Sequence, residues 1–353
     1  MIHARYIQNK NLSPARGLAI DEALCGFVAK GEAPPSLHLY NYVPSVIIGR
    51  YQNASASLRL DRCEDLGIRV NRRISGGGTV FMTPDQLAFA LVLPTGFPGL
   101  PSGIHGSFQF LVAALARALR SFHLEAEFMG KNDLTVNGKK IAGLAISQDH
   151  EGVTFFHASL LIDFDLETML EILNLPTKRM LDRGISCFGN RMTTMNAETG
   201  KKLSLEEVRE AVHRAVSGEL DLDLPLEDLS PGEEEIVSRL SRERYENDEW
   251  IYGMRTPKRR MGFAEAKTPA GLIQVHLALS GGAIETLMIT GDYFSRTRDI
   301  VKLESILKWT SFRREAVLQR LEESGADRFI HRLDLPPLLE LIKQAANERK
   351  TIA

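Results

Sequence analysis

The chain has 353 residues, a length that favours about two domains at roughly 150 residues each. Its 44% hydrophobic and 25% charged residues are ordinary for a globular protein and argue against a disordered chain. The 43 Lys and Arg residues are balanced by 45 Asp and Glu residues, and the net charge of -2 argues against a nucleic-acid-binding protein with a basic surface overall.

The three cysteines, Cys25, Cys63 and Cys187, are too few and too widely spaced for a disulfide framework or a CxxC zinc site. The first residues lack the apolar segment of a secretory signal, and no apolar run is long enough to span a membrane. We therefore expect a reduced, cytoplasmic protein with no membrane partner. Cys25 is expected on an apolar helix with its side chain in the protein core, and Cys63 is expected on a surface helix.

Apolar periodicity predicts a first helix over residues 14–30, beginning after Ser13. Short strands separated by Gly and Pro turns are predicted at 37–40, 45–48, 68–73, 79–82 and 87–93. An amphipathic helix is predicted at 107–122. The Asn137-Gly138 pair between two strand-like runs predicts a β-hairpin, because both residues tolerate a positive φ.

Further along, the pattern predicts a strand at 153–162 and helices at 166–173, 205–216 and 234–244. The acidic, Pro-containing segment 221–235 is expected to be a linker or a segment at the edge of a domain. Strands at 272–279 and 283–289, then helices at 313–324 and 336–347, predict a small α+β module. We expect an α+β protein with a large, mixed, mostly antiparallel sheet in residues 1–248 and the small module in 249–353.

The segment RRISGGGT is the strongest local signal for chemistry. Three glycines, 76–78, let the backbone come close to a ligand, and their N–H groups can face anionic oxygens. Arg72 and Arg73 supply permanent positive charge for a phosphate or a carboxylate. A flexible hairpin loop with a basic edge is the alternative interpretation.

The segment around the predicted hairpin offers a second group of polar residues. Asp133 could hold Mg²⁺ near phosphates, and Lys140 would mount an ammonium on a rigid strand. A solvated Lys-Lys turn is the alternative. Alone, Arg50 indicates only a polar loop, and His157 within an apolar strand indicates a core or edge histidine. No second His or Cys lies near His157 at metal-ligand spacing.

Taken together, six segments resemble the lipoate–protein ligase family. In collinear order they are LAIDEAL (18–24), VIIGRYQN (46–53), RRISGGGTVF (72–81), GKNDLTVNGKKIAG (130–143), HASLLIDFD (157–165) and GISCFGNRMT (184–193). The stretch from Trp250 through the two late strands to TGDYF (290–294) is similar to that family's accessory domain. The resemblance implies a large domain of the biotin and lipoyl ligase type with a small C-terminal accessory domain.

The resemblance implies an enzyme that uses Mg·ATP to convert lipoate or octanoate to an acyl-adenylate, then acylates a lysine of a small lipoyl-domain protein. Lys140 matches the family lysine that contacts the acyl carboxyl and phosphate groups. The residues implied to line the acyl-adenylate site are Arg50, Arg73, Ser75, Gly76, Gly77, Gly78, Thr79, Val80 and His157. Asn132 and Asp133 fall at the nucleotide and Mg²⁺ side. We expect a monomer without a nucleic-acid partner.

One departure and two alternatives accompany this interpretation. Met82 stands where the family pattern has a histidine, and its side chain cannot replace that hydrogen-bonding group. An acyl transferase that works through a cysteine thioester is one alternative, although Glu127-Phe128-Met129 lacks the cysteine that some such relatives carry there. Cys187 would then be the thiol to test. The other alternative is a non-catalytic protein that binds lipoyl domains.

Overall fold

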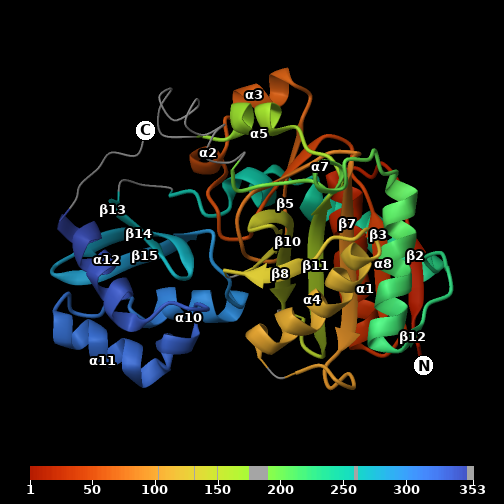
Figure 1. The fold of residues 1–353 in the computed structure, drawn as a ribbon. Coiled ribbons are helices and arrows are strands. Elements are labelled where there is room, and N and C mark those ends of the chain that lie inside the picture. The colour runs from red at the N-terminus through yellow and green to blue at the C-terminus, as the bar shows by residue number, and fades with distance from the viewer. Residues whose placement is uncertain (102, 131, 149, 175–189, 258–260, 348–353) are drawn as a thin grey trace. The chain divides into compact units, whose positions relative to one another are not determined.

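The structure is a computed structural model that describes residues 1–353 except 102, 131, 149, 175–189, 258–260 and 348–353 (Figure 1). The chain forms two compact units. Unit 1 comprises Met1–Ile47, Ser57–Arg72 and Val80–Asn247. Unit 2 comprises Ile48–Ala56, Arg73–Thr79 and Asp248–Ala353.

Unit 1 is built on a seven-stranded sheet in the order β2-β3-β7-β11-β10-β9-β8. Neighbouring strands are antiparallel except for the parallel pair β2 and β3. This confirms the predicted mixed, mostly antiparallel sheet. The strands are β2 (Arg5–Gln8), β3 (Ser36–Tyr40), β7 (Gln86–Pro94), β8 (Ala126–Met129), β9 (Asp133–Val136), β10 (Lys139–Ser147) and β11 (Val153–Leu161).

The two faces of this sheet differ in composition because successive side chains of a strand point to opposite sides. One face carries large apolar residues such as Leu91 and Phe156, which join a core cluster with residues of α4 (Ile104–Arg120) and α8 (Leu205–Leu220). The opposite face carries Ala88, Ala90 and His157, which stand in neighbouring register positions of β7 and β11. The large-residue face therefore forms the main core of unit 1.

Helix α1 (Pro14–Ala29) also packs in unit 1, as the apolar spacing predicts. The side chain of Ser13 accepts a hydrogen bond from the Arg16 N–H and begins the helix. Asp21 of α1 contacts His38 Nδ1 at 2.9 Å and accepts a hydrogen bond from the Tyr40 hydroxyl at 2.7 Å. These buried polar contacts join α1 to β3.

The remaining elements of this region include a small sheet in the order β5-β4-β6. Its strands and the other short elements are β1 (Ile2–His3), β4 (Ser45–Ile48), α3 (Leu60–Asp65), β5 (Arg69–Arg72), β6 (Val80–Met82), α5 (Leu166–Ile172), α7 (Met195–Thr199), β12 (Leu222–Asp223), α9 (Pro231–Leu240) and η1 (Ser241–Tyr245). Helix α2 (Ala54–Ser57) lies at the boundary, with its first three residues in unit 2. Helix α3 lies at the surface as expected, with Asp61, Glu64 and Asp65 exposed, and Cys63 is the residue on its buried side.

The linker expected over 221–235 is instead an ordered part of unit 1. Strand β12 pairs in parallel with β1, and Leu226 forms a bridge with Tyr6. Ser230 then caps α9 through a reciprocal capping box with Glu233, whose carboxylate also forms a buried ion pair with Arg5. The acids and prolines that predicted a linker instead form the turns and the helix cap of this packed segment.

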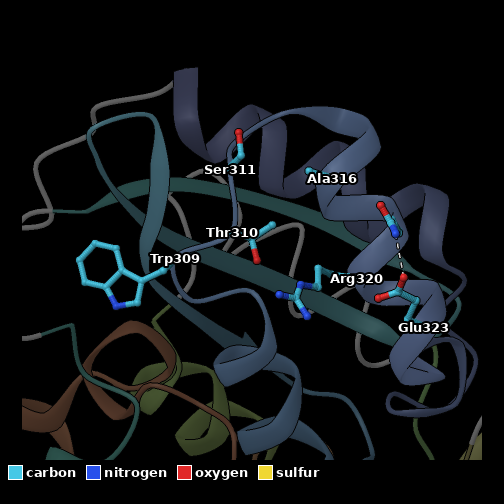
Figure 2. Close-up of a pocket in the computed structure, with 7 residues that line it drawn as sticks. Trp309, Thr310, Ser311, Ala316, Arg320 and Glu323 are labelled. Carbon is cyan, nitrogen blue, oxygen red and sulfur yellow. Dashed lines mark hydrogen bonds between the residues drawn. The ribbon is translucent and has the colours of Figure 1, made fainter.

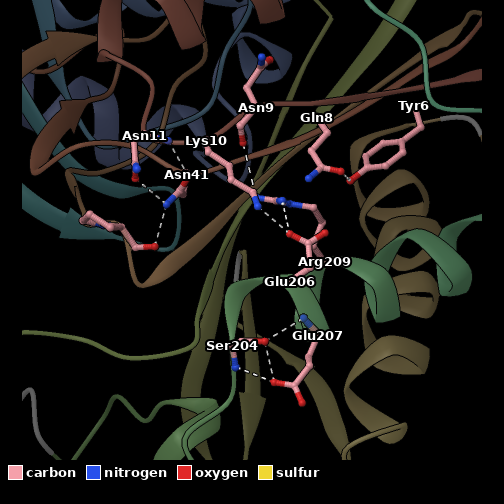
Figure 3. A network of polar contacts seen from close by, with 11 residues as sticks. Tyr6, Gln8, Asn9, Lys10, Asn11, Asn41, Ser204, Glu206, Glu207 and Arg209 are labelled. Atoms are coloured by element: carbon pink, nitrogen blue, oxygen red, sulfur yellow. Dashed lines mark hydrogen bonds and ion pairs between the residues drawn. The ribbon is translucent and has the colours of Figure 1, made fainter.

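Helix α8 is tied to the N-terminal strand by a polar network (Figure 3). Arg209 is almost fully buried, and its guanidinium donates to Glu206 at 2.9 Å and to the carbonyl of Asn9 at 3.5 Å. Glu206 also pairs with Lys10 at 3.0 Å. Since a buried guanidinium requires polar partners, these contacts fix how α8 lies against the residues that follow β2.

Unit 2 contains a three-stranded antiparallel sheet with helices packed on it. The elements are η2 (Glu249–Gly253), β13 (Gly262–Thr268), β14 (Gly271–Ser280), β15 (Ala283–Gly291), α10 (Thr297–Ile306), α11 (Arg314–Ser324), η3 (Ala326–Arg328) and α12 (Leu335–Asn347). Ile273, Ile289, Leu303 and Leu338 belong to its core, which also includes Tyr51. Two loops from the N-terminal half of the sequence thus belong to this unit.

Within the described part of the chain, no helix is both long and apolar enough to cross a membrane.

His276 of β14 is predicted to make unit 2 sensitive to acid. Its side chain is 4% exposed, and Nε2 lies 3.0 Å from Thr290 Oγ1. Nδ1 is buried and has no hydrogen-bond partner among the residues that the structure describes. Burial lowers the pKa of His276 from 6.5 to about 4. The His276 imidazole therefore binds a proton more tightly in the unfolded chain than in the folded protein. The free energy of unfolding should fall by on the order of 3 kcal/mol as the pH drops from 6.5 to 4.

Denaturant unfolding of wild type and His276→Gln across this pH range measures the effect. The variant should show a shallower loss of unfolding free energy toward low pH. His3→Gln, which changes an exposed histidine, should retain the wild-type slope. Equal slopes for wild type and His276→Gln would contradict the assignment.

Candidate functional site

The hairpin of β9 and β10 carries Lys140, the predicted catalytic residue. Asn137 and Gly138 have φ values of 50° and 74°, which confirms the predicted tight turn with two left-handed residues. Lys139 pairs with Val136, and Lys140 pairs with Thr135. The turn therefore places Lys140 one residue into a strand of the large sheet.

The ammonium of Lys140 lies 2.7 Å from Asp133 Oδ1. Both side chains are about one-third exposed, at 34% and 39%. A Cβ added to Gly143 would lie 3.2 Å from Lys140 Nζ and 3.6 Å from Ser159 Oγ. The missing side chain of Gly143 thus leaves the space that the Lys140 side chain occupies.

The main chain of Lys140 is fixed by a second segment as well as by β9. Its N–H donates to the carbonyl of Arg191 at 2.7 Å, and its carbonyl accepts from the N–H of Thr193 at 2.9 Å. The register with β9 shifts between Lys140 and Ala142, which is typical of a β-bulge. The lysine is therefore held on a rigid base.

Asn132 and His157 lie near this hairpin in the sheet order. The side-chain amide of Asn132 donates to the main-chain carbonyl of Leu144 at 2.8 Å, and the main-chain carbonyl of Asn132 accepts from the Leu144 N–H at 2.9 Å. Asn132 thereby clamps β10. His157 is half-buried, stacks on Phe155 with ring centroids 5.1 Å apart, and pairs in register with Ala145 of β10.

The glycine loop, residues 73–79, belongs to unit 2 and is braced by its own arginine. The guanidinium of Arg73 donates to the carbonyls of Gly76 and Gly78, each at 2.8 Å, and to Ser75 Oγ at 3.2 Å. Arg73 is buried. Its charge in this conformation faces loop carbonyls.

The glycine loop packs closely on TGDYF, the segment at the end of β15, whereas the sequence predicted a close approach of its backbone to a ligand. The Gly77 N–H donates to the carbonyl of Tyr293 at 3.0 Å, and Gly77 has a φ of 94°. A Cβ on Gly76 would lie 2.3 Å from the Tyr293 oxygen, and one on Gly77 would lie 3.0 Å from the Phe294 ring. Packing inside unit 2 alone therefore requires glycine at 76 and 77.

The loop that follows β4 contacts the same elements of unit 2. The Arg50 N–H donates to the carbonyl of Ser75 at 2.9 Å, and the Arg50 guanidinium lies 5.1 Å from the centre of the Trp250 ring. Tyr51 stacks on Tyr293 with centroids 4.8 Å apart. Thr79 Oγ1 donates to the side-chain oxygen of Gln52 at 3.3 Å.

The structure thus groups the residues proposed from sequence into two sets. Lys140, Asp133, Asn132 and His157 lie in unit 1 on neighbouring strands, and the other set, Arg50 and residues 73–79, lies in unit 2. Val80 begins β6 and pairs with Ile47 of β4.

Met82, the departure from the family pattern, is buried and pairs with Ser45. Its side chain therefore contributes to packing at the end of β6.

Sequence reasoning missed three contributions to these groups. Gly143 could have been found, because a glycine inside a strand signals close approach of another group. The other two contributions join segments that are distant in sequence, which no local pattern reveals. Lys140 contacts Arg191 and Thr193, about 50 residues away, and the glycine loop contacts Tyr293, more than 200 residues away.

The described cysteines are poor nucleophiles. Cys25 and Cys63 are free and buried. Burial is the main cause that raises the pKa of each thiol, with acidic neighbours adding to the effect. Cys187 lies outside the described residues. Among the described residues, no group of three or more His, Cys, Asp or Glu is placed to hold a metal ion.

Comparison with known proteins identifies the family. Residues 13–217 match the lipoyl protein ligase A/B catalytic domain, and residues 263–342 match the bacterial lipoate protein ligase C-terminus. The chain is 30% identical to lipoate-protein ligase LplJ of Bacillus subtilis over 96% of this chain and 99% of that protein. The chain belongs to the lipoate–protein ligase family and has that family's C-terminal domain, as the resemblance predicts.

Other relatives show that the family includes a second activity. Octanoyltransferase LipM of Brevibacillus brevis is 27% identical over 70% of this chain and 97% of its own length. A bipartite lipoate protein ligase from Thermoplasma acidophilum, studied with its E2 lipoyl domain, has a TM-score of 0.66 and 26% identity over 73% of this chain and 99% of its own. A lipoate-protein ligase A bound with ATP has a TM-score of 0.63 and 26% identity over 72% and 100%.

Two glycines of the same loop should respond differently to alanine. At Gly76, the added Cβ would meet the Tyr293 carbonyl, so Gly76→Ala should destabilise the protein by about 1–3 kcal/mol. At Gly78, the nearest atom to an added Cβ is Asp292 Cβ at 3.7 Å, so Gly78→Ala should change stability by less than about 0.5 kcal/mol. Thermal denaturation of both variants measures this, and equal melting temperatures would contradict the packing described.

Proposed function

We propose that the protein is an ATP-dependent lipoate or octanoate ligase that acylates a lysine of a small lipoyl-domain acceptor. The observation that carries this proposal is the ammonium of Lys140, held over Gly143 beside Asp133 on a strand of the large sheet. A fixed cation of this kind suits a reaction that brings several anions together.

In the first proposed step, a carboxylate oxygen of the acid attacks the α-phosphorus of ATP. The bond from that phosphorus to the bridging oxygen of the β-phosphate breaks, and pyrophosphate leaves with the bonding electrons. The acid and the triphosphate repel each other, and Lys140 lowers this repulsion because its charge is fixed before the substrates bind.

In the second step, the neutral amine of the acceptor lysine attacks the carbonyl carbon of the acyl-adenylate. An amide forms, AMP leaves, and the attacking nitrogen loses a proton to water or to the departing phosphate. Lys140 near the carbonyl and phosphate oxygens would stabilise the negative charge that develops on both.

Magnesium is proposed to arrive with ATP as part of the substrate. Asp133 offers one carboxylate, which fits because Mg²⁺ sites near nucleotides commonly use one or two carboxylates plus phosphate oxygens. The Asp133 carboxylate pairs with Lys140 in the free protein. A cation bound at Asp133 would take over this carboxylate and leave the charge of Lys140, held on its strand, to face the anionic substrates.

The remaining site residues keep the roles that the resemblance implies, as proposals. Asn132 is assigned to the nucleotide side, and His157, Val80, Arg50 and the glycine loop to the acyl-adenylate. The bracing of the loop by Arg73 and the half-buried position of His157 are compatible with these roles. We also propose that residues 1–248 form the catalytic domain and residues 249–353 the accessory domain. The protein is further proposed to act as a monomer in the cytoplasm.

A cysteine-dependent octanoyltransferase is the second candidate, favoured by the similarity to LipM. Two observations support the ligase instead. The match to LplJ extends across the C-terminal region, whereas the match to LipM covers less of the chain. Burial also keeps Cys25 and Cys63 protonated, and a thiolate is the form that attacks an acyl group.

Release of pyrophosphate from Mg·ATP with lipoate or octanoate tests the ligase. Lys140→Ala should reduce acid-dependent release by about 100-fold or more, the effect typical of losing one preorganised electrostatic group. Lys139→Ala is the matched control, because neighbouring strand residues point to opposite faces, and it should stay within about twofold of wild type. Absence of release from wild type with either acid would contradict the ligase and leave the transferase or a non-catalytic lipoyl-domain binding protein.

Cys187→Ser separates the two enzymatic candidates. A ligase needs no thiol, so the variant should retain acylation of an apo lipoyl domain in the presence of ATP, within about twofold. The measurement is mass spectrometry of the acceptor with lipoate plus ATP, and in parallel with octanoyl-acyl carrier protein without ATP. Loss of an ATP-independent transfer in Cys187→Ser would instead establish the thioester route.

A further inference from the structure

The row of side chains that crosses the large sheet at Gly143 contains a polar group to which the proposed reaction assigns no role. Residues in register on neighbouring strands point to the same face of a sheet. In the strand order β9, β10, β11, β7 and β3, the members of this row are Asp133, Gly143, Ser159, Ala88 and Tyr40. The row therefore sets the hydroxyl of Ser159 on the same face as Asp133, one strand beyond Gly143.

The Ser159 hydroxyl differs from the other polar groups of this row in its bonding. Asp133 pairs with Lys140 at 2.7 Å, and the Tyr40 hydroxyl donates to Asp21 at 2.7 Å. Ser159 is half-buried, and its hydroxyl forms no hydrogen bond with any residue in the described part of the chain. Since polar groups withdrawn from water normally have a partner, this hydroxyl is available to a ligand.

Ser159 and Lys140 approach the same point of the sheet. A Cβ added to Gly143 would lie 3.6 Å from Ser159 Oγ and 3.2 Å from Lys140 Nζ. The β-bulge between Lys140 and Ala142 explains the position of the lysine. Residues three apart in a regular strand point to opposite faces, and one extra residue brings Lys140 to the face of Gly143. An ammonium and a hydroxyl, both hydrogen-bond donors, therefore flank one position above β10.

The two sides of Lys140 differ in charge. Strand β9 places the Asp133 carboxylate beside the ammonium, and strand β11, on the other side of β10, places the neutral hydroxyl of Ser159 there. A carboxylate ligand is repelled by Asp133, whereas Ser159 can donate a hydrogen bond to it. The acid substrate therefore fits on the Ser159 side of the lysine, and a triphosphate that carries a cation fits on the Asp133 side.

We propose that Ser159 is a further catalytic residue, whose hydroxyl donates a hydrogen bond to the carboxylate of the acid beside Lys140. This role rests on the proposed function and belongs to the same reaction. In the first step, one carboxylate oxygen attacks the α-phosphorus of ATP, and Ser159 holds the other. That second oxygen becomes the carbonyl oxygen of the acyl-adenylate, and it takes up negative charge when the acceptor amine attacks. The same donor thus orients the acid and then stabilises this charge.

Ser159→Ala tests the first of these two contributions, because it removes the hydroxyl and keeps a small side chain on the strand. In pyrophosphate release with octanoate, the KM for octanoate should rise about tenfold, the loss expected for one hydrogen bond to a charged group. The KM for ATP should stay within about twofold of wild type. The melting temperature should not fall, because no described residue loses a hydrogen bond.

Ser311→Ala is the matched control, because it also exchanges one serine hydroxyl for hydrogen. Ser311 is exposed and lies at a surface pocket of unit 2, formed by the turn after α10 and by one side of α11 (Figure 2). None of the residues assigned to the reaction lines this pocket. Both KM values of Ser311→Ala should therefore equal those of wild type.

A single-turnover assay tests the second contribution. Synthetic octanoyl-AMP, given to the protein with an apo lipoyl domain and no ATP, bypasses the first step and reports only the transfer to the acceptor lysine. Ser159→Ala should slow this transfer at least about tenfold, because the developing negative charge on the carbonyl oxygen loses one donor. Ser311→Ala should transfer at the wild-type rate.

The possible results separate the role of Ser159 from the proposed function. A selective rise in the KM for octanoate with slower transfer supports the role. Unchanged kinetics of Ser159→Ala, or an equal rise in both KM values, overturn it even if the wild type is a ligase. Absence of pyrophosphate release from wild type contradicts the proposed function. Calorimetric titration with octanoate then decides for Ser159: weaker binding by Ser159→Ala supports the contact, and equal or absent binding overturns it.

Discussion

The candidate catalytic ammonium lies against β10 where Gly143 has no side chain. Lys140 Nζ is 3.2 Å from the position that a Cβ at residue 143 would take, so a side chain there would crowd the ammonium that reaches Asp133. The hairpin turn, the β-bulge after Lys140 and the main-chain bonds to Arg191 and Thr193 all fix the lysine relative to this space. The proposed chemistry depends on that fit, because an electrostatic contribution to catalysis requires a group that is already in place.

Most of the long elements could be predicted from sequence, because their periodicity is strong. Helix α1, strand β7 and the Asn137-Gly138 hairpin lie where apolar spacing and turn chemistry place them. Strand β8 was missed because a four-residue edge strand carries little local signal, and helix α10 was missed although Ile300 and Leu303 stand at helical spacing. Segment 221–235 was misjudged because its acids and prolines are also the residues of caps and turns.

The candidate site shows the same division between local and long-range information. The residue types of Lys140 and Asp133 and their place on a hairpin follow from one stretch of 14 residues, GKNDLTVNGKKIAG. The contacts that hold the glycine loop cannot be predicted from a local stretch, because Tyr293 lies more than 200 residues away in sequence. The triple glycine was interpreted as a place for an anion, and the structure adds that Gly76 and Gly77 must also be small to pack against Tyr293 and Phe294.

The composition of unit 2 has a consequence for how this protein can be recombined with its relatives. Residues 248–353 form one compact body together with the short loops 48–56 and 73–79, through contacts such as the Tyr51–Tyr293 stack. A chimera joined at residue 248 would import a foreign C-terminal module but keep native loops shaped for a different surface. Substitutions at Tyr293 and Phe294 should therefore covary with residues 49–52 and 76–77, and a functional exchange must transfer three stretches of sequence together.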